Sequence, residues 1–174
     1  MTAAERDALL VADDGLLLRQ VEATFVRTGG PGGQHRNKVS TGVRLAHRAS
    51  GVEAAATERR SQAENRRVAL DRLRAALALE LRAPCGDGAA GLPEAVRAVL
   101  ASKRWPRLSP KAQDYWLVAA RVLDALSAEG ARVSEAARRL GVSTGSLVKF
   151  LGTEPHLWQA ALRLRQAAGL GPLR

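Results

Sequence analysis

A break in composition at residues 83–91 divides this chain into two parts with different folding signals. The stretch holds three glycines and one proline in nine residues, and both residue types interrupt regular secondary structure. We therefore predict a linker at 83–92 between an N-terminal domain at 1–82 and a C-terminal domain at 93–174. A length of 174 residues is enough for two small domains, each with a modest core.

The N-terminal part combines strand and helix patterns. β-forming and alternating residues predict three strands, at 21–27, 41–47 and 52–56, with a turn at Ser50-Gly51 that makes a hairpin of the last two. From about 58 to 82, apolar residues recur at helical spacing with arginines on the opposite face. These patterns predict a small sheet covered by one long helix.

The C-terminal part is predicted to be entirely helical, which makes the fold class α+β. Apolar spacing indicates helices near 93–102 and 110–128, and a last helix from 153 or 154 to about 168. Between them, residues 134–151 have the length and turn spacing of a helix-turn-helix. Trp116 and Trp158 are expected in the core of this domain.

Several residues in the C-terminal part have the chemistry of helix ends. Ser109 before Pro110 is a credible N-cap, and Pro93 suits a first helical position. Serine caps and a left-handed glycine are expected around the turn of the helix-turn-helix. These residues are Ser134, Gly141 and Ser143.

The charge of the chain points to a polyanionic partner. Lys and Arg number 27 against 17 Asp and Glu, which gives a formal net charge of +10 and favours nucleic acid, with an acidic membrane surface as the second choice. One cysteine and three histidines supply neither a disulfide nor a zinc site, so no metal or cofactor is expected. Because no signal sequence or membrane span is evident, we expect a cytoplasmic protein that does not enter membranes.

The most informative segment is a glycine-rich connection at 27–41 between two predicted strands. Four glycines and a proline occupy residues 29–33, and five hydrogen-bonding side chains follow at 34–38. Such a segment is often only a loop. An exposed tip of this composition could also insert into a narrow polyanionic site and present backbone N–H groups there.

An ordered series of residues gives this segment a family resemblance. The tripeptide Gly32-Gly33-Gln34 is followed by Asn37-Lys38-Val39-Ser40-Thr41, then by Ser50-Gly51-Val52, and on the predicted helix by Arg60-Ser61-Gln62 with Asn65-Arg66. This series resembles the catalytic domain of class I peptide chain release factors. The resemblance covers residues 21 to about 70.

The resemblance implies hydrolysis of the ester that joins a nascent peptide to tRNA, in the peptidyl transferase centre of the ribosome. Its implied catalytic residues are Gly32, Gly33 and Gln34. Contacts with ribosomal RNA are assigned to His35, Arg36, Asn37, Lys38, Arg44 and, in the helical domain, Lys149. Ser61, Gln62 and Asn65 are expected to brace the loop. The expected partners are the large-subunit RNA and peptidyl-tRNA, with the protein acting as a monomer.

Only about 20 residues precede the first predicted strand, so reading of a stop codon is not expected. The chain therefore resembles the short rescue factors of the alternative ribosome-rescue factor B type, which act without a codon. It departs from them at its end, because residues 162–174 hold three bases rather than a dense basic tail. Action on dissociated large subunits that carry obstructed nascent chains is a second possibility.

The 133–151 stretch also resembles the helix-turn-helix of bacterial DNA-binding regulators. Its second helix offers Thr144, Ser146 and Lys149 but no Arg, Asn or Gln for bidentate base contacts. A phosphate or ribosome docking surface, a purely structural unit and specific DNA binding all stay open. In the last case the glycine loop would belong to a non-catalytic scaffold. Nearby, Trp105 among Lys103, Arg104 and Arg107 could stack on a base or pack inward.

Overall fold

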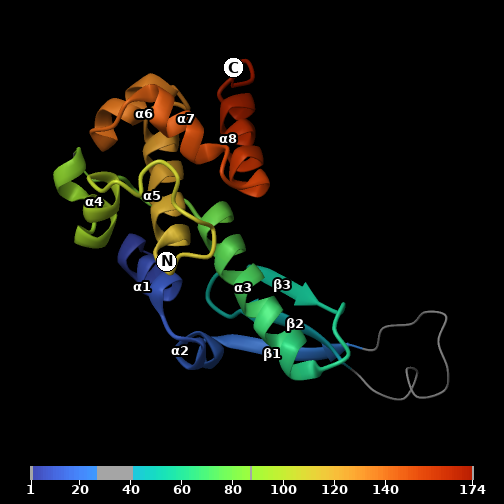
Figure 1. Cartoon of the computed structure of the whole chain (residues 1–174). Helices are drawn as coiled ribbons and strands as arrows, with labels where there is room; N and C mark the ends of the chain where they lie inside the picture. Colours follow the sequence, from blue (N-terminus) through green and yellow to red (C-terminus); the bar gives the residue numbers. More distant parts are fainter. Residues whose placement is uncertain (1, 27–40, 87, 174) are drawn as a thin grey trace. The chain divides into compact units, whose positions relative to one another are not determined.

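The computed structural model describes residues 2–26, 41–86 and 88–173 (Figure 1). Over these ranges it contains three β-strands and eight α-helices, so the predicted mixture of a small sheet and helices is confirmed. The chain divides into two compact units. The sheet unit comprises Ala12–Leu77, and the helical unit combines Thr2–Val11 with Ala78–Arg174.

The sheet unit contains an antiparallel sheet in the order β1-β2-β3. Its strands are β1 (Val21–Val26), β2 (Gly42–His47) and β3 (Glu53–Ala56), each within one residue of its predicted bounds. The β2–β3 hairpin turns at Gly51, whose φ of 70° is the left-handed conformation that glycine adopts without strain. This local chemistry explains why the hairpin was predictable.

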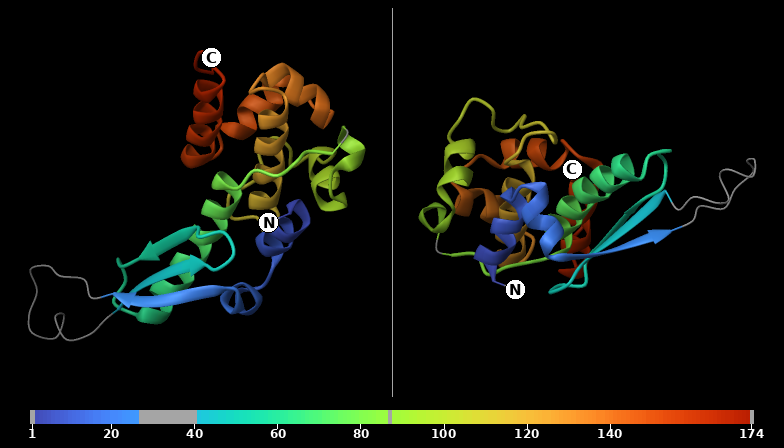
Figure 2. Two further views of the ribbon diagram at one scale, coloured as in Figure 1. Left: turned by 180° about the vertical axis from the view of Figure 1, so that it is seen from behind. Right: turned by 90° about the horizontal axis from the view of Figure 1, so that it is seen from below.

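Helix α3 (Gln62–Glu80) lies along one face of the sheet (Figure 2). Its apolar stripe is fully buried, as are the inward-facing Val43 and Leu45 of β2. The helix is shorter than the predicted 58–82. At its start, the first helical hydrogen bond runs from the Asn65 N–H to the Ser61 carbonyl at 3.0 Å, so Ser61 precedes the first helical residue. The division between the two units falls within α3, after Leu77.

Two short helices precede the sheet and were not predicted. Helix α1 (Ala3–Val11) belongs to the helical unit, and α2 (Asp14–Arg19) belongs to the sheet unit. A capping box begins α1: the Glu5 N–H donates to Thr2 Oγ1 at 3.2 Å, and Glu5 Oε2 accepts from the Thr2 N–H at 2.6 Å. The Thr-x-x-Glu pattern in the sequence was therefore an overlooked signal.

The helical unit is built around α5 (Tyr115–Ala128), in which 11 of 14 residues are buried. Helix α5 starts five residues later than predicted, because Ser109 and Pro110 begin a turn instead, with the Ala112 N–H donating to the Ser109 carbonyl at 2.9 Å. The other helices of this unit are α4 (Glu94–Leu100), α6 (Val133–Leu140), α7 (Thr144–Leu151) and α8 (Pro155–Ala167). Trp116 and Trp158 are half-buried, so their placement in the core was wrong.

The connection between α6 and α7 follows the predicted end chemistry at two of three residues. Gly141 ends α6 with a left-handed φ of 70°, and the Ser143 hydroxyl accepts from the Ser146 N–H at 3.2 Å. The predicted cap at Ser134 was wrong, because α6 begins at Val133 and Ser134 lies inside it. Assignment of this pair as a DNA-binding helix-turn-helix stays a prediction.

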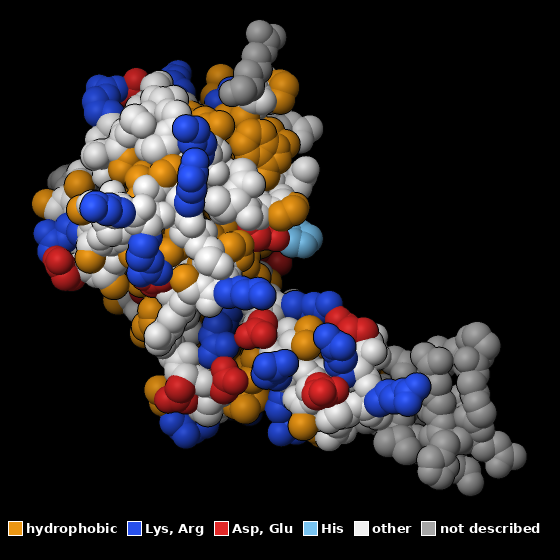
Figure 3. Space-filling model, viewed as in Figure 1, with side chains coloured by type: hydrophobic (Ala, Val, Ile, Leu, Met, Phe, Trp, Pro, Cys, Tyr) orange, Lys and Arg blue, Asp and Glu red, His pale blue; other side chains and the backbone are white. Residues whose placement is uncertain are grey.

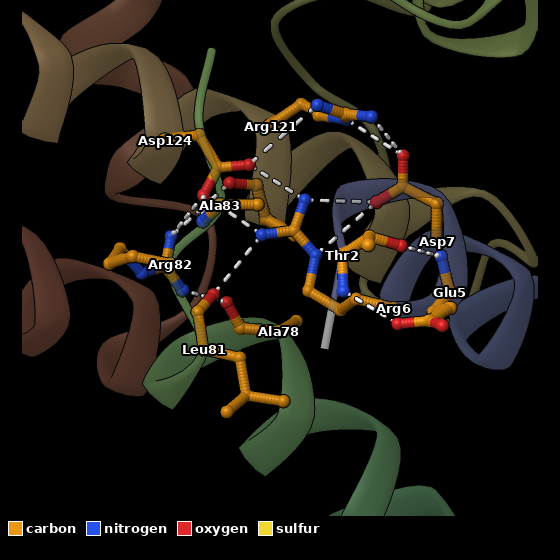
Figure 4. A network of polar contacts seen from close by, with 11 residues as sticks. Thr2, Glu5, Arg6, Asp7, Ala78, Leu81, Arg82, Ala83, Arg121 and Asp124 are labelled. Carbon is orange, nitrogen blue, oxygen red and sulfur yellow. Dashed lines mark hydrogen bonds and ion pairs between the residues drawn. The ribbon is translucent and has the colours of Figure 1, made fainter. Parts of the chain in front are cut away.

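A buried ionic network joins α1 to α5 inside the helical unit (Figure 4). The Arg6 guanidinium donates to both Asp124 oxygens, at 2.8 and 2.6 Å, and to Asp7 at 2.9 Å. Arg121 donates to Asp7 at 2.7 Å, and Arg82 lies 3.3 Å from Asp124. Burial lowers the pKa of Arg82 to about 10, although the charge of Asp124 opposes this shift. The Arg82 guanidinium therefore stays charged at neutral pH.

The stretch predicted as a linker is held by this same unit. The Ala83 N–H donates to Asp124 at 3.0 Å, and Arg139 donates to the Gly86 carbonyl at 2.9 Å. Residues Ala89–Gly91 form a short 3-10 helix. The compact units thus separate at 77/78, with α1 in the second unit, whereas the sequence placed the boundary at 82/83.

Candidate functional site

The tripeptide that carries the proposed chemistry lies outside the described residues. Residues 27–40 include the predicted catalytic and RNA-contacting residues Gly32, Gly33, Gln34, His35, Arg36, Asn37 and Lys38. Their assignment stays a prediction. The structure does describe the edge of the sheet from which this segment begins and to which it returns.

Strand pairing holds the two flanking ends of the segment together. In the β1–β2 register, Val26 is the partner of Gly42, and this is the last pair before the segment. A Cβ added to Gly42 would lie 2.6 Å from Val26 Cγ2 and 2.9 Å from the Val26 carbonyl oxygen. Glycine is therefore required at residue 42, because any side chain would force the two strand ends apart.

Asn65 fixes the return of the chain to β2. The side chain is fully buried, and its Nδ2 donates to the Thr41 carbonyl at 2.7 Å and to the Arg59 carbonyl at 2.9 Å. Its Oδ1 accepts from the Arg59 N–H at 2.9 Å. One amide thus ties the first turn of α3 to the residue before β2, and its role in bracing the loop stays a prediction.

The other two residues predicted to brace the loop lie at the start of α3. Ser61 is exposed, and its hydroxyl accepts from the Glu64 N–H at 3.4 Å, which is a weak cap. Gln62 is half-buried in the first turn. The contact with the residue before β2 is made by Asn65.

Arg44, predicted to contact RNA, lies on the exposed side of β2 and is paired. Its Nε donates to Glu53 on β3 at 2.9 Å, and both side chains are about half exposed. Exposed pairs of this kind contribute little to stability. A phosphate could therefore replace Glu53 at small cost, and contact with RNA stays a prediction.

Sequence reasoning missed an aromatic and cationic group near the same edge of the sheet. Phe25 is 46% exposed on β1, and the Arg66 guanidinium carbon lies 5.7 Å from the centre of its ring. The exposed Arg59, Arg60 and Arg67 add positive charge around the start of α3. The sequence does show arginines next to Ser61, Gln62 and Asn65. Strand pairing was needed to place Phe25 near them.

Lys149, the predicted contact outside the sheet unit, is exposed on α7. Its helix packs through Leu147, Phe150 and Leu151, which are buried. Within the described ranges no cluster of His, Cys, Asp or Glu is arranged to hold a metal ion. The helices described include none that is long and apolar enough to cross a membrane.

Comparison with known proteins identifies the sheet unit. Residues 16–85 match the RF-1 domain family. This part of the chain is an RF-1 domain. The domain contains β1, β2, β3 and α3, and therefore both Gly42 and Asn65. It also contains Gly32, Gly33 and Gln34.

The relatives of the RF-1 domain are peptide chain release factors. Chloroplastic peptide chain release factor PrfB1 of Arabidopsis thaliana is 49% identical over 57 residues, which are 33% of this chain and 12% of that protein. Peptide chain release factor 1 of Leuconostoc citreum is 50% identical over 46 residues, 26% of this chain and 13% of that protein. The corresponding protein of Acidiphilium cryptum is 44% identical over 64 residues, 37% of this chain and 18% of that protein.

The resemblance therefore covers a small part of each relative. The matched stretch spans between 12% and 18% of the length of these three release factors. The family match ends at residue 85, so α4 to α8 lie beyond it. No solved structure gave a significant match.

Proposed function

We propose that this protein is a codon-independent peptidyl-tRNA hydrolase that releases nascent peptides from stalled ribosomes. The observation that carries the proposal is the RF-1 domain at 16–85, whose relatives are named peptide chain release factors. That domain includes Gly32-Gly33-Gln34 between two strands that pair up to Val26 and Gly42. Ribosome-bound peptidyl-tRNA is the substrate that this resemblance implies.

The chemistry requires stabilisation of a developing oxyanion. When water attacks the peptidyl ester, negative charge develops on the carbonyl oxygen, and one well-placed N–H donor lowers the barrier by about 3 kcal/mol. We assign that donor to the backbone N–H of Gln34, with its side-chain amide shaping the pocket for water. Gly32 and Gly33 then permit close approach to RNA, because neither carries a side chain.

The described edge of the sheet supports this assignment mechanically. An oxyanion donor acts only if it is held in place before the reaction. Asn65 clamps Thr41, and the close contact of Gly42 with Val26 fixes the strand pair at the same edge. The RF-1 domain thus provides a rigid base from which residues 27–40 begin and end.

Codon independence is the part of the proposal that concerns the rest of the chain. Residues on both sides of the RF-1 domain, Thr2–Val11 and those after residue 85, belong to one helical unit. We propose that this unit attaches the protein to the ribosome through its exposed cations. Recognition of RNA rather than of a stop codon would then bring the RF-1 domain to its substrate.

The test is peptide release by the full chain from ribosomes stalled on an mRNA without a stop codon. Gly33→Ala is expected to reduce the release rate at least 100-fold, because the added methyl group blocks the close approach that places the Gln34 N–H, and misplacing an oxyanion donor costs as much as losing it. Gln34→Ala keeps that backbone N–H and removes only the side-chain amide, so a smaller reduction is expected. Gly171→Ala is the matched control, because residue 171 is exposed and an added Cβ would meet nothing within 4 Å. Its rate should equal that of the unmodified chain.

Two further substrates define the alternatives. Equal rates with and without a stop codon in the ribosomal A site would support codon independence, and release only with a stop codon would contradict it. If peptide is released only from isolated large subunits that carry peptidyl-tRNA, these subunits and not stalled ribosomes are the substrate. Full activity of Gly33→Ala would contradict the assignment of the glycine segment as the catalytic element.

A further inference from the structure

The segment that joins α4 to α5 is strongly basic. Residues 101–113 contain Lys103, Arg104, Arg107 and Lys111, with neither Asp nor Glu among them. The segment lies outside the RF-1 domain, which ends at residue 85. Lys and Arg side chains are visible on the face of the helical unit that carries this segment (Figure 3).

Trp105 attaches the segment to α7. Its ring centre lies 4.7 Å from that of Phe150, and its Nε1–H donates to Ser146 Oγ at 3.1 Å. The ring of Tyr115 lies 5.5 Å from Phe150 on another side. The inward packing of Trp105 that the sequence left open is therefore what the structure shows, and the basic segment is fixed beside the first turn of α7.

Most of the cations on this segment are not engaged within the protein. Arg104 donates to Asp114 at 2.9 and 3.1 Å. In contrast, Lys103, Arg107 and Lys111 are exposed and form no ion pair with any described residue. The same holds for Lys149 on α7. Four exposed cations thus lie on this segment and on the helix to which Trp105 attaches it.

The first turn of α7 adds a surface that a backbone can approach closely. Thr144 and Gly145 are exposed, and a Cβ added to Gly145 would meet nothing within 4 Å. The start of a helix carries partial positive charge from its free N–H groups. We name the whole the Trp105 surface: Lys103, Arg107, Lys111, Lys149 and residues 143–146.

We propose that the Trp105 surface binds the phosphate backbone of RNA. The inference rests on the proposed function, because the ribosome supplies RNA as the polyanion that this protein meets. Contacts with phosphates position a protein without reading sequence. Sequence-specific DNA binding fits less well, since the Ser146 hydroxyl already contacts Trp105 and α7 has no Arg, Asn or Gln to read bases.

The first test is binding of the full chain to a fluorescent RNA hairpin, measured by anisotropy from 50 to 300 mM KCl. The double variant Lys103→Glu/Arg107→Glu is expected to bind at least tenfold more weakly at the lowest salt. Its log–log salt slope should fall by about two, because two phosphate contacts are lost. Arg132→Glu/Arg163→Glu carries the same change of charge on exposed residues outside the Trp105 surface. We expect this control to lose little RNA affinity.

A second variant separates binding from folding. Gly145→Glu adds a negative charge where the free protein has open space, and an acidic residue in the first turn of a helix is favourable for helix stability. We expect unchanged or higher thermal stability together with at least fivefold weaker RNA binding. Gly171→Glu, equally exposed, is the matched control for the added charge.

Three outcomes would overturn the inference. They are unchanged RNA binding by the Lys103/Arg107 pair, equal losses from the Arg132/Arg163 pair, and tighter binding to a particular DNA sequence than to RNA. Failure of the proposed function is seen separately, because Gly33→Ala removes peptide release but should leave hairpin binding as it is. If the chain binds RNA through this surface but releases no peptide, the RNA-binding inference is supported and the proposed hydrolase function is contradicted.

Discussion

At the residue scale, the RF-1 domain depends on a few polar side chains that have no access to water. Asn65 uses two N–H bonds and one acceptor in a fully buried position. A buried amide is costly unless its hydrogen bonds are made. Its energetic role is therefore tied to the geometry of residues 41 and 59.

Replacement of Asn65 by Asp should uncouple these residues. An ionised carboxylate of the same shape cannot donate, so it would face the carbonyl oxygens of Thr41 and Arg59 without a bond. We expect a loss of about 2–3 kcal/mol in the free energy of unfolding, with slower peptide release, measured by urea titration and by the release assay. Ser61→Ala removes a single weak hydrogen bond, so its free energy of unfolding should stay close to that of the unmodified chain. An Asn65→Asp protein with unchanged stability would contradict the structural role assigned to the Asn65 hydrogen bonds.

His47 should make the stability of the sheet unit depend on pH. The ring is buried, its Nδ1 lies 2.8 Å from Ser50 Oγ, and its Nε2 has no hydrogen-bond partner. Burial lowers the pKa of His47 below its ordinary value of 6.5. The unfolded chain therefore binds the proton first, so the stability present above pH 6.5 is lost as the pH falls below that value.

Urea titrations at pH 7.5 and 5.5 measure this loss. His47→Gln should flatten the dependence, because it removes the titrating group, whereas His156→Gln on the exposed surface of α8 should retain it. A His47→Gln protein with the same pH dependence as the unmodified chain would show that another group is responsible.

At the element scale, helix ends separate what was predictable from what was not. Gly141 and Ser143 act locally, and their residue types nearly determine the turn between α6 and α7. The start of α5 and the exposure of Trp116 depend on which elements pack around them, and no local pattern carries that information. At the candidate site the Asn65 bracing was indicated by resemblance, while Phe25 beside Arg66 required the strand register.

Two serines in neighbouring helices test the importance of the cap. Ser143 accepts from the Ser146 N–H at 3.2 Å at the start of α7, whereas Ser134 lies inside α6. Ser143→Ala should cost about 1 kcal/mol in the free energy of unfolding. Ser134→Ala should be neutral or slightly stabilising, since alanine is the better helix former. Thermal unfolding of both variants decides, and equal effects would contradict the assigned cap.

At the scale of the whole molecule, the helical unit is built from two stretches that are separated in the sequence. Helix α1 precedes the RF-1 domain in the sequence but belongs to the helical unit, where Arg6 is held by Asp124. Among the described residues, Arg6, Arg82 and Arg121 face two carboxylates, Asp7 and Asp124, so loss of one carboxylate would leave a strong excess of buried positive charge. Hydrophobic periodicity could not reveal this network, since charged residues are normally predicted to be exposed.

Asp124→Asn should therefore destabilise the helical unit selectively. Breaking a buried ionic contact by removing one partner costs about 3–5 kcal/mol, and Asp124 accepts from Arg6, Arg82 and the Ala83 N–H. Hydrogen exchange should show faster exchange of α5 amides, while amides of β2 keep their protection, because the two compact units have separate cores. Glu135→Gln, which breaks the exposed ion pair with Arg138, is the control. It should change amide exchange in neither α5 nor β2. Equal loss of protection in both units would mean that they unfold as one, and the RF-1 domain would then depend on the helical unit for its stability.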